Sequence, residues 1–424
     1  MNHRVSRRQL LKGSAALAGL ALSAGNAESA DARVAFQQSG DGVASSVRPG
    51  VDVLLDRKLD LVAGKRIGLV TNPTGVTGKL VSTVDALAGN PNVKLTALFG
   101  PEHGVRGAAQ AGDHIGDAVD KRTGVTAYSL YGETKRPTAA MLRNVDVLVF
   151  DVQDVGTRFY TYIYTLAYVM EAAAQSAKRV IVLDRPNPLS GLAVEGAVLE
   201  KGLESFVGLY PIPLRHGMTI GELAELYRGE FGIKCDLTVV TMEGWRRRLW
   251  YDETGLPWIP PSPNVPTLDS AVVYPGTGLL EATNLSVGRG TTRPLETLGA
   301  PWIEAEAWAD DLNGRGLAGV RFRPTYFVPT FDVYRSQNCG GVQVHVLDRL
   351  RFRPIEIGLS LIQSARKLYP DKFAWQRGNG FELMAGNNRI RSQVESGAPV
   401  VEIARGWDEG LTRFAEARRK YLLY

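Results

Sequence analysis

The sequence predicts an α/β fold with a Rossmann-like, doubly wound and mostly parallel sheet. Between residues 66 and 183, short apolar segments of the length of a buried strand alternate with segments of helical spacing. The apolar segments stop at Gly, Pro, Asn or Asp, which is how strands end before a turn. Strands that alternate with helices at this spacing form parallel βαβ units.

The individual elements follow from the same patterns. Strands are predicted at residues 66–71, 93–99, 125–130, 145–150 and 179–183, and helices at residues 79–87, 137–142 and 159–178. Thr219 and Glu222 form a capping box that opens another helix, so Glu222 is expected to be structural. The proline-rich residues 257–266 exclude a helix or a central strand. The remaining sequence predicts helices at residues 303–312, 355–368 and 411–422 and strands at residues 319–322 and 341–346.

At 424 residues the chain is too long for one ordinary hydrophobic core. We expect a signal peptide over residues 1–30 and a flexible segment over residues 31–50. A Rossmann-like N-terminal catalytic domain is expected over residues 51–270, and a smaller α+β C-terminal domain over residues 271–424 that completes the cleft.

The first 30 residues are typical of an export signal. The segment Ser-Arg-Arg-Gln-Leu-Leu-Lys at residues 6–12 fits the twin-arginine pattern, and an apolar run with small residues follows it. This run is too short and too rich in Ala and Gly to span a membrane stably. We therefore expect a periplasmic or secreted protein, exported by the twin-arginine route and without stable membrane insertion.

Charge and cysteine content limit the classes of partner. The first 30 residues hold four basic side chains and one acidic side chain, so without them the formal charge falls from +5 to +2. No stripe of Lys and Arg follows, which argues against nucleic acid as a partner. Cys235 and Cys339 are the only cysteines, and one disulfide or two unpaired buried thiols are both compatible with the sequence. The spacing of the two cysteines matches no metal motif. We expect neither a metal nor another cofactor.

The loop after the strand at residues 93–99 carries the strongest indication of chemistry. Gly100 and Pro101 end that strand, and Glu102, His103 and Arg106 follow at once. In open α/β sheets, ligands bind beyond the carboxyl ends of the strands. An acid, an imidazole and a guanidinium at this position therefore indicate an active site. The alternative is a solvated ion pair between Glu102 and Arg106.

Polar side chains also follow three other predicted strands, and the carboxyl ends of parallel strands face one crevice. These side chains are Asn72 after the first strand, Asp151 and Asp154 after the fourth, and Asp184, Arg185 and Asn187 after the fifth. One or two of the aspartates are expected to serve only as helix caps or turn formers. His216 precedes the capped helix, where it either reaches the crevice or is an ordinary surface histidine.

A glycine-rich segment at residues 274–294 has the composition of a loop that approaches a ligand closely. Its polar residues are Glu281, Asn284, Arg289 and Arg293. Neither Gly-x-Gly-x-x-Gly nor Gly-x-x-x-x-Gly-Lys-Ser/Thr is present, so the segment lacks the phosphate-binding fingerprints.

The motifs taken together resemble one known family. They are Phe-Gly-Pro-Glu-His-Gly-Val-Arg-Gly at 99–107, Phe-Asp-Val-Gln-Asp-Val-Gly-Thr-Arg-Phe-Tyr-Thr-Tyr at 150–162, Asp-Arg-Pro-Asn-Pro at 184–188, Arg-His-Gly-Met-Thr at 215–219, Pro-Pro-Ser-Pro-Asn at 260–264 and Leu-Glu-Ala-Thr-Asn at 280–284. This set resembles the NamZ family of exo-β-N-acetylmuramidases over nearly all of the mature chain. The resemblance implies a Rossmann-like N-terminal domain, a smaller C-terminal domain and an active site between them.

The resemblance also implies the reaction, which is removal of β-1,4-linked N-acetylmuramic acid (MurNAc) from the non-reducing ends of peptidoglycan fragments, as in cell-wall turnover. It makes Glu102 the leading catalytic carboxylate, with His103 beside it, and the acids and arginines of the other motifs would line the cleft. Most glycosidases use a second carboxylate or the substrate's acetamido group. Asp154 and Asp151 are the next choices, followed by Glu281, and the anomeric outcome stays open.

Muramic acid differs from glucosamine by an O-lactyl carboxylate, which a guanidinium can hold through two hydrogen bonds. Arg158 is the first candidate, and Arg289 and Arg293 rank lower because a flexible loop positions less firmly. Tyr162 either offers a ring face to the sugar or belongs to the core. The other predicted substrate contacts are Asp184, Arg185, Asn187, His216, Asn264, Glu281 and Asn284.

Three other functions compete with this interpretation. A nucleotide-cofactor enzyme is disfavoured by the missing glycine fingerprint. A non-catalytic periplasmic protein that binds sugars or muropeptides is disfavoured by the number of carboxylates, because binding alone needs fewer. A metal-dependent hydrolase would use Glu102, His103, Asp154 and His216, and activity that is lost to a chelator and restored by zinc would favour it.

Overall fold

The structure is a computed structural model that describes residues 46–107, 110, 112 and 116–424. The predicted signal peptide and most of the predicted flexible segment therefore lie outside the described residues. Within the described part, no helix combines the length and the apolar character that crossing a membrane requires.

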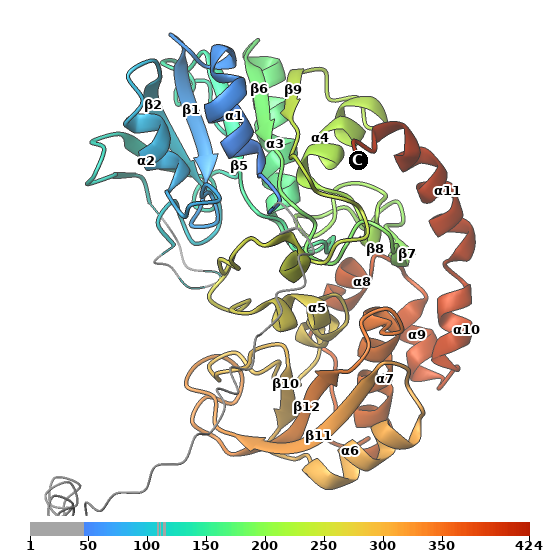
Figure 1. The fold of residues 1–424 in the computed structure, drawn as a ribbon. Coiled ribbons are helices and arrows are strands. Elements are labelled where there is room, and N and C mark those ends of the chain that lie inside the picture. The colour runs from blue at the N-terminus through green and yellow to red at the C-terminus, as the bar shows by residue number, and fades with distance from the viewer. Residues whose placement is uncertain (1–45, 108–109, 111, 113–115) are drawn as a thin grey trace, which may run out of the picture. The chain divides into compact units, whose positions relative to one another are not determined.

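A seven-stranded sheet in the order β3-β4-β2-β1-β5-β6-β9 forms the N-terminal half (Figure 1). The strands are β1 (Arg66–Thr71), β2 (Lys94–Gly100), β3 (Ala118–Val119), β4 (Thr126–Ser129), β5 (Val147–Asp151), β6 (Arg179–Leu183) and β9 (Asp236–Val240). Only β3 pairs in the antiparallel direction. The six parallel strands, numbered in chain order, have the spatial order 3-2-1-4-5-6, which is the Rossmann order with its switch point between β1 and β5. The predicted fold class is confirmed.

Helices cover both faces of this sheet because successive side chains of a strand point to opposite sides. Val147 and Val149 of β5 pack in the cluster that contains α1 (Gly50–Arg57) and α2 (Thr83–Ala88). Leu148 and Phe150 of the same strand pack in the cluster with α3 (Tyr162–Gln175) and α4 (Ile220–Gly229). The capping box of Thr219 and Glu222 is present at the start of α4, as predicted.

The C-terminal half is built on a three-stranded antiparallel sheet in the order β10-β12-β11, lower in Figure 1. Its elements are α5 (Leu268–Thr277), β10 (Thr297–Ala300), α6 (Ala305–Gly314), β11 (Val320–Phe327), β12 (Cys339–Val346), α7 (Pro354–Leu368), α8 (Gly380–Ala385), α9 (Ile390–Glu395), α10 (Val400–Arg405) and α11 (Asp408–Arg418). Helices α5 and α7 cross very closely: a Cβ on Gly276 would lie 1.8 Å from the carbonyl oxygen of Pro354. Only glycine permits this crossing. This half is the predicted α+β unit.

The C-terminal segment returns to the Rossmann-like sheet. Helix α11 packs against the hairpin of β7 (Glu195–Val198) and β8 (Pro213–Arg215), and the chain then runs beside α4 (Figure 1). The hydroxyl of Tyr424 accepts from Met242 N at 2.8 Å and donates to Asp184 at 2.6 Å. The last residues therefore help to hold the end of β6.

Three local predictions need correction or completion. Residues 137–142 form turns and no helix, because a segment of this length supplies too few hydrogen bonds to offset helix nucleation. The helix predicted at residues 79–87 begins only at Thr83, since Leu80 has a positive φ of 62°. Cys235 and Cys339 are both buried and unbridged, and burial raises the pKa of each thiol to about 11.

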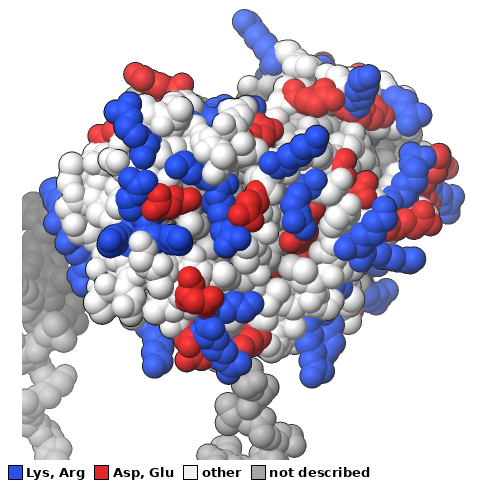
Figure 2. All heavy atoms as spheres, turned by 90° about the horizontal axis from the view of Figure 1, so that it is seen from above, with Lys and Arg blue, Asp and Glu red and all other residues white. Residues whose placement is uncertain are grey.

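Charged side chains of both signs are interspersed on the face that Figure 2 shows. Within the sheet, charged side chains at the starts of neighbouring strands form ion pairs: Arg66 of β1 lies 2.6 Å from Asp146, and Arg179 of β6 lies 2.9 Å from Asp236 of β9.

Candidate active site

The loop after β2 turns back sharply over the end of its strand. A Cβ on Gly100 would lie 2.8 Å from Val105 N, which shows how tight the turn is. His103 is buried and has a φ of +71°, and Gly104 follows with +76°. A left-handed backbone costs a residue other than glycine about 1–2 kcal/mol. Such strain persists only where the surroundings enforce it, and it concentrates at functional sites.

Two of the four left-handed residues other than glycine in the C-terminal half also lie at this place. Leu295 and Asp332 have φ values of 69° each, and both line the pockets described below. Together with His103, they place three left-handed residues around one cavity system. They are three of the eight such residues in the described part of the chain, and their meeting at one cavity is consistent with a functional site there.

Glu102 is half-buried and lies among tyrosines. Its Oε1 accepts a hydrogen bond from Gly112 N at 3.0 Å. The hydroxyl of Tyr162 donates to Pro261 O at 2.6 Å and lies 3.4 Å from the Glu102 carbonyl oxygen. Burial and then the charge of Glu102 raise the pKa of Tyr131 to about 12. These phenols remain protonated at neutral pH, so they surround the carboxylate as neutral polar groups.

Two adjoining pockets lie over this loop. The smaller, of about 70 Å³, is lined by Glu102, His103, Phe159, Tyr160, Thr161, Ser262, Asn264, Val265, Tyr274, Arg289 and Leu295. The larger, of about 610 Å³, is lined by Gln110, Asn264, Glu281, Thr283, Leu285, Val287, Arg289, Phe331, Asp332, Val333 and Gln376. They share Asn264 and Arg289, so we treat them as one cleft, of a size that suits a small ligand.

Arg289 is the one Lys or Arg among the described residues that line this cleft. Its Nη2 donates to Glu281 at 2.9 Å, and its Nε lies 3.8 Å from Asp332. Burial lowers the pKa of Arg289, but Glu281 outweighs that effect, so the pKa stays above its ordinary value. The cleft therefore holds a fixed cation next to two carboxylates.

Asn264 offers an unused hydrogen-bond donor to the cleft. Its side chain is buried, and its Nδ2 has no partner among the described residues. Buried amides are nearly always hydrogen-bonded, so this group is a candidate for contact with a ligand.

Aromatic rings form a wall of the smaller pocket. Phe159 meets Tyr274 edge to face, with centroids 5.0 Å apart, and Tyr160 meets Tyr162 in the same way at 4.8 Å. Burial holds the pKa of Tyr160 and of Tyr274 well above the ordinary value. Rings that are fixed in this way can pack against the apolar face of a sugar.

The structure thus gathers five of the predicted site residues around one cleft, with Tyr162 beneath them: Glu102, His103, Asn264, Glu281 and Arg289. Arg106 pairs with Asp120 at 2.8 Å and with Asp85 at 3.2 Å, and not with Glu102. The alternative of a solvated pair between Glu102 and Arg106 is therefore wrong.

Asp151 and Arg185 form a buried ion pair at the switch point of the sheet. Arg185 donates to the two carboxylate oxygens of Asp151 from Nε at 2.6 Å and from Nη2 at 2.9 Å. Thr83 donates to the same carboxylate at 2.5 Å. Both ionic side chains are buried and lie outside the cleft lining. Their placement favours a structural role over the predicted catalysis and substrate binding.

The side chain of Asp184 also makes hydrogen bonds that stabilise the fold. It accepts hydrogen bonds from Thr219 Oγ1 at 2.7 Å, Gly221 N at 2.7 Å and the Tyr424 hydroxyl at 2.6 Å. Burial raises the pKa of Asp184 to about 7, although the bond from Tyr424 works in the opposite direction. The carboxyl therefore ties β6, α4 and the C-terminal residue together.

This raised pKa predicts a pH-dependent stability that Asp184→Asn removes. The folded pKa lies above the unfolded value, so the stabilisation is complete below about pH 4 and is lost as the pH rises through about 7. Relative to the unsubstituted chain, the variant should gain about 2.5 kcal/mol between pH 5 and pH 8, because about two pKa units of the shift lie in that range, at 1.36 kcal/mol per unit. Urea unfolding at the two pH values measures the difference. Parallel pH curves for the two proteins would contradict the assignment.

Asp154 and His216 form a second buried pair. His216 Nε2 lies 3.2 Å from Asp154, whose Oδ2 accepts from Gly156 N at 2.7 Å. Met218 N donates to Nδ1 of His216 at 3.2 Å. Neither residue lines the cleft. The four residues of the metal-hydrolase alternative are therefore not gathered at one point, and no three His, Cys, Asp or Glu side chains of the described residues are arranged to hold a metal ion.

Arg158 is fully buried and does not reach the cleft. Its guanidinium donates to the carbonyl oxygens of Ala197 at 2.9 Å, Ile212 at 3.2 Å and Met384 at 2.7 Å. Burial lowers its pKa to about 10. These bonds join the β7–β8 region to α8. The placement therefore does not support the prediction that Arg158 binds the lactyl carboxylate of the substrate.

Three further residues that were predicted to contact the substrate instead make hydrogen bonds or ion pairs outside the cleft. Asn187 bonds to Met218 O and Leu189 N, and Asn284 bonds to the backbone at Lys372 and Ala374. Arg293 is partly exposed and pairs with Glu296 at 3.2 Å. None of the three lines the cleft.

Several cleft residues were not predicted. Tyr131, which interacts with Glu102 without lining the cleft, comes two residues after β4, so the pattern of polar residues at strand ends could have identified it. Asp332, Gln110 and Gln376 come from loops in which no periodicity or spacing marks them. Tyr274 lies at the start of the glycine-rich segment, but its apolar neighbours made it resemble a core residue.

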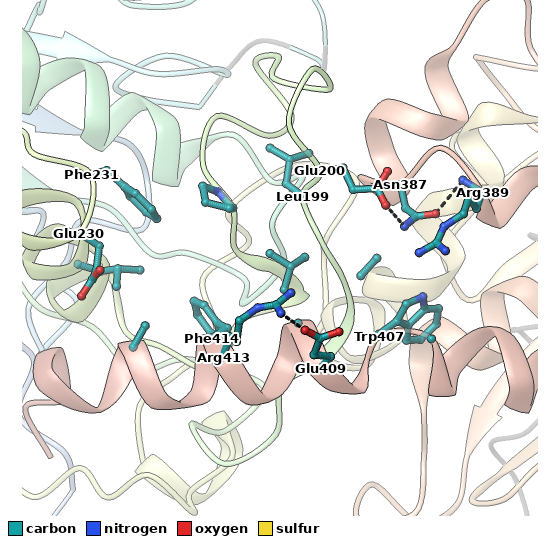
Figure 3. Close-up of a pocket in the computed structure, with 17 residues that line it drawn as sticks. Leu199, Glu200, Glu230, Phe231, Asn387, Arg389, Trp407, Glu409, Arg413 and Phe414 are labelled. Atoms are coloured by element: carbon teal, nitrogen blue, oxygen red, sulfur yellow. Dashed lines mark hydrogen bonds and ion pairs between the residues drawn. The ribbon is translucent and has the colours of Figure 1, made fainter.

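A separate pocket of about 550 Å³ lies between the β7 region and α11 (Figure 3). Its polar groups largely satisfy one another. Asn387 donates to Glu200 at 2.6 Å, and Arg413 pairs with Glu409 (Figure 3). None of the predicted catalytic or substrate-binding residues lines this pocket, so it is not a candidate for the active site.

A Rossmann-like sheet with carboxylates, one arginine and aromatic rings in a cleft defines an α/β protein suited to bind and cleave a sugar. The family described as Exo-beta-N-acetylmuramidase NamZ, N-terminal, matches residues 67–269, and its C-terminal counterpart matches residues 272–424. The chain belongs to the NamZ family of exo-β-N-acetylmuramidases, which are glycosidases.

Relatives agree with this membership. The peptidoglycan beta-N-acetylmuramidase NamZ of Bacillus subtilis (strain 168) is 53% identical over 378 residues, which are 89% of this chain and 91% of that protein. A solved DUF1343 family protein from Bacteroides fragilis NCTC 9343 has a TM-score of 0.83 and 42% identity, covering 89% of this chain and 99% of that chain. A second such protein from the same organism has a TM-score of 0.71 and 32% identity, covering 90% and 99%.

Proposed function

We propose that this chain releases β-1,4-linked MurNAc from the non-reducing ends of peptidoglycan fragments, with Glu102 as the catalytic acid. Family membership supports the reaction class. The observation that carries the assignment of Glu102 is its position on a strained loop that lines the cleft, beside the fixed cation Arg289. A half-buried carboxyl group that reaches the cleft can, in its protonated form, transfer a proton to a leaving oxygen.

In this mechanism the proton of Glu102 goes to the glycosidic oxygen as the bond from that oxygen to the anomeric carbon breaks. Water then adds to the anomeric carbon and gives up its proton to a base. Glu281 and Asp332 are the cleft carboxylates available to assist, because Asp151 and Asp154 lie outside the cleft lining. The acetamido group of the substrate is the alternative. Proton NMR of the first-formed anomer distinguishes retention from inversion.

Arg289 is our candidate for the lactyl carboxylate. It is the one basic Lys or Arg side chain among the described lining residues, and it remains charged. Asn264 Nδ2 can donate to a hydroxyl or to the acetamido oxygen, and the rings of Phe159 and Tyr274 can pack against the sugar. An anionic substituent, a polar edge and an apolar face are the features that muramic acid presents.

The decisive test compares para-nitrophenyl β-N-acetylmuramide with para-nitrophenyl β-N-acetylglucosaminide. The purified chain should cleave the first with the higher kcat/KM. Equal rates, or a preference for the glucosaminide, would contradict the proposed substrate. Loss of activity to a chelator with recovery on addition of zinc would instead support the metal-dependent alternative.

Arg289→Gln should reduce this preference. Loss of one charge-assisted contact of about 1.5–3 kcal/mol corresponds to a fall of roughly 10–100-fold in kcat/KM for the muramide. The glucosaminide lacks the lactyl group, so its kcat/KM should change much less. Arg293→Gln is the matched control, because Arg293 lies on the same segment but outside the cleft lining. A similar loss for both substrates would exclude recognition of the lactyl group by Arg289.

We also propose export by the twin-arginine route. Replacement of Arg7 and Arg8 by lysine should leave the full-length precursor in the cytoplasm, because the route requires the arginine pair. Immunoblots of cytoplasmic and periplasmic fractions measure the distribution. Unchanged export of the double variant would contradict this route.

A further inference from the structure

A second pocket, of about 510 Å³, has the chemistry of a binding site for an anion. It shares no lining residue with the cleft at Glu102. Its wall comes from the loop before β7, from β8, from the turn before α7, and from α10 and α11. Five arginines line it: Arg215, Arg248, Arg349, Arg353 and Arg405. We call it the arginine pocket.

Acidic side chains only partly balance these arginines. Glu195, Glu356 and Asp408 also line the pocket. Burial raises the pKa of Glu195 to about 7 and raises the pKa of Glu356, in each case against the opposing charge of a nearby arginine. Among the lining residues, basic side chains therefore outnumber acidic ones by five to three.

Two of the five arginine side chains make no hydrogen bond or ion pair with the described part of the chain. Arg349 pairs with Asp252 and Asp269, and Arg353 donates to backbone carbonyls. Arg248 and Arg405 are exposed, and across the described ranges no hydrogen bond or ion pair engages either side chain. Their guanidinium groups are free to take a ligand.

The floor of the pocket also has an unused donor. Arg215 is 4% exposed, donates to Leu189 O at 2.6 Å and lies 3.9 Å from Glu195. Its Nε has no partner in the described part of the chain. Arg215 and Arg349 both lie 5.4 Å from the ring centre of Trp250, which stiffens the basic wall. A buried donor without a partner is rare and indicates a missing acceptor.

Apolar side chains stand at the rim of the same pocket. Leu192 is 57% exposed, Leu350 is 75% exposed and Val401 is 51% exposed, and all three belong to the lining. Exposed apolar residues that gather around one pocket mark an interaction site more often than single ones do. The ligand should therefore combine anionic groups with small apolar groups.

We propose that the arginine pocket binds a short peptide that bears free carboxylates and small apolar side chains. The stem peptides of peptidoglycan have this chemistry, with alanine methyl groups beside several carboxylates, and their amino groups could meet Asp408 or Glu356. The choice of this peptide rests on the proposed function. A second contact with the same polymer would keep a glycan strand near the cleft between cleavage events.

Isothermal titration calorimetry of the full chain with the tetrapeptide L-Ala-γ-D-Glu-meso-diaminopimelyl-D-Ala tests the inference. We expect saturable binding that excess free MurNAc does not displace. The double variant Arg248→Gln with Arg405→Gln should weaken it roughly tenfold or more, because two charge-assisted contacts are lost. Arg246→Gln is the matched control: it removes an exposed arginine two positions from Arg248, outside the pocket lining, and should leave the Kd unchanged.

Three outcomes would overturn the inference. They are absence of binding, an equal Kd in the double variant, and equal binding of a peptide whose carboxyl groups are all amidated. Association with phosphatidylglycerol vesicles that is lost in the double variant, without peptide binding, would make a membrane the occupant instead. Hydrolysis of the nitrophenyl muramide without peptide binding overturns only this inference. Peptide binding without hydrolysis overturns only the proposed function.

Discussion

Glu102→Gln is expected to abolish release of MurNAc while the fold is retained. Gln has the shape of Glu, and its Oε1 can still accept the hydrogen bond from Gly112 N. Its amide cannot transfer a proton to the glycosidic oxygen. General acid catalysis contributes about 10²–10⁴-fold to rates, so kcat/KM on a natural disaccharide should fall by at least that range. Release of free MurNAc, followed by chromatography, measures the effect.

The identity of the leaving group sharpens this test. A para-nitrophenolate leaves readily without a proton, whereas a sugar hydroxyl does not. If Glu102 is the acid, the variant should lose much less activity on the nitrophenyl muramide than on the disaccharide. An equal loss on both substrates would instead assign Glu102 as nucleophile or base. Full turnover of the disaccharide would exclude Glu102 from the chemistry.

A matched control separates chemistry from loss of charge. Glu133 is an exposed glutamate that follows Tyr131 closely and lies outside the cleft lining. Glu133→Gln should keep the activity of the unsubstituted chain. Unfolding temperatures of all three proteins should agree, which shows that any loss at position 102 is not a loss of folded protein.

The central sheet could be predicted because its signal is local. Each strand of the sheet core is a short apolar run, since both faces are covered by helices, and its end is marked by the residues of the following turn. Residues 66–71 and 179–183 were predicted with the bounds of β1 and β6. By contrast, residues 137–142 have helical composition without the length that sustains a helix.

The site was only partly predictable because a polar residue at a strand end can either line the cleft or be buried in a structural ion pair. Glu102 and Asp151 both follow a strand, yet Glu102 lines a cleft and Asp151 is buried against Arg185 and Thr83. The difference depends on partners that lie 34 and 68 positions away from Asp151 in the chain. No local sequence pattern shows which residues from distant parts of the chain will lie beside a strand end.

Arg158 and Arg289 show the same limit for cations. Arg158 stands between Gly156 and Phe159 and Arg289 between two glycines, and Arg289 was ranked lower because a flexible loop positions a side chain less firmly. In the structure, Arg158 donates to three carbonyl oxygens, whereas Arg289 faces the cleft beside Glu281. Every residue has a carbonyl oxygen, so the sequence does not show which of them will accept hydrogen bonds from one buried guanidinium.

The largest effect on stability is expected from Arg185→Met. The substitution leaves Asp151 fully buried without its cation and deprives Val76 O of a donor. Removal of one partner from a buried ion pair costs about 3–5 kcal/mol, because the remaining charge stays desolvated. Urea unfolding, with the midpoint and the slope both measured, should show that loss in the free energy of unfolding.

A second substitution tests the cause of that loss. Asp151→Asn combined with Arg185→Met removes the buried charge, and Thr83 Oγ1 can still donate to the amide oxygen. The double variant should therefore be more stable than Arg185→Met alone, since a neutral amide costs less to bury than an unpaired carboxylate. If the two variants are equally unstable, the loss comes from packing at position 185 rather than from the unpaired buried charge of Asp151. In that case the switch point between β1 and β5 would depend on the volume of the Arg185 side chain and not on its ion pair.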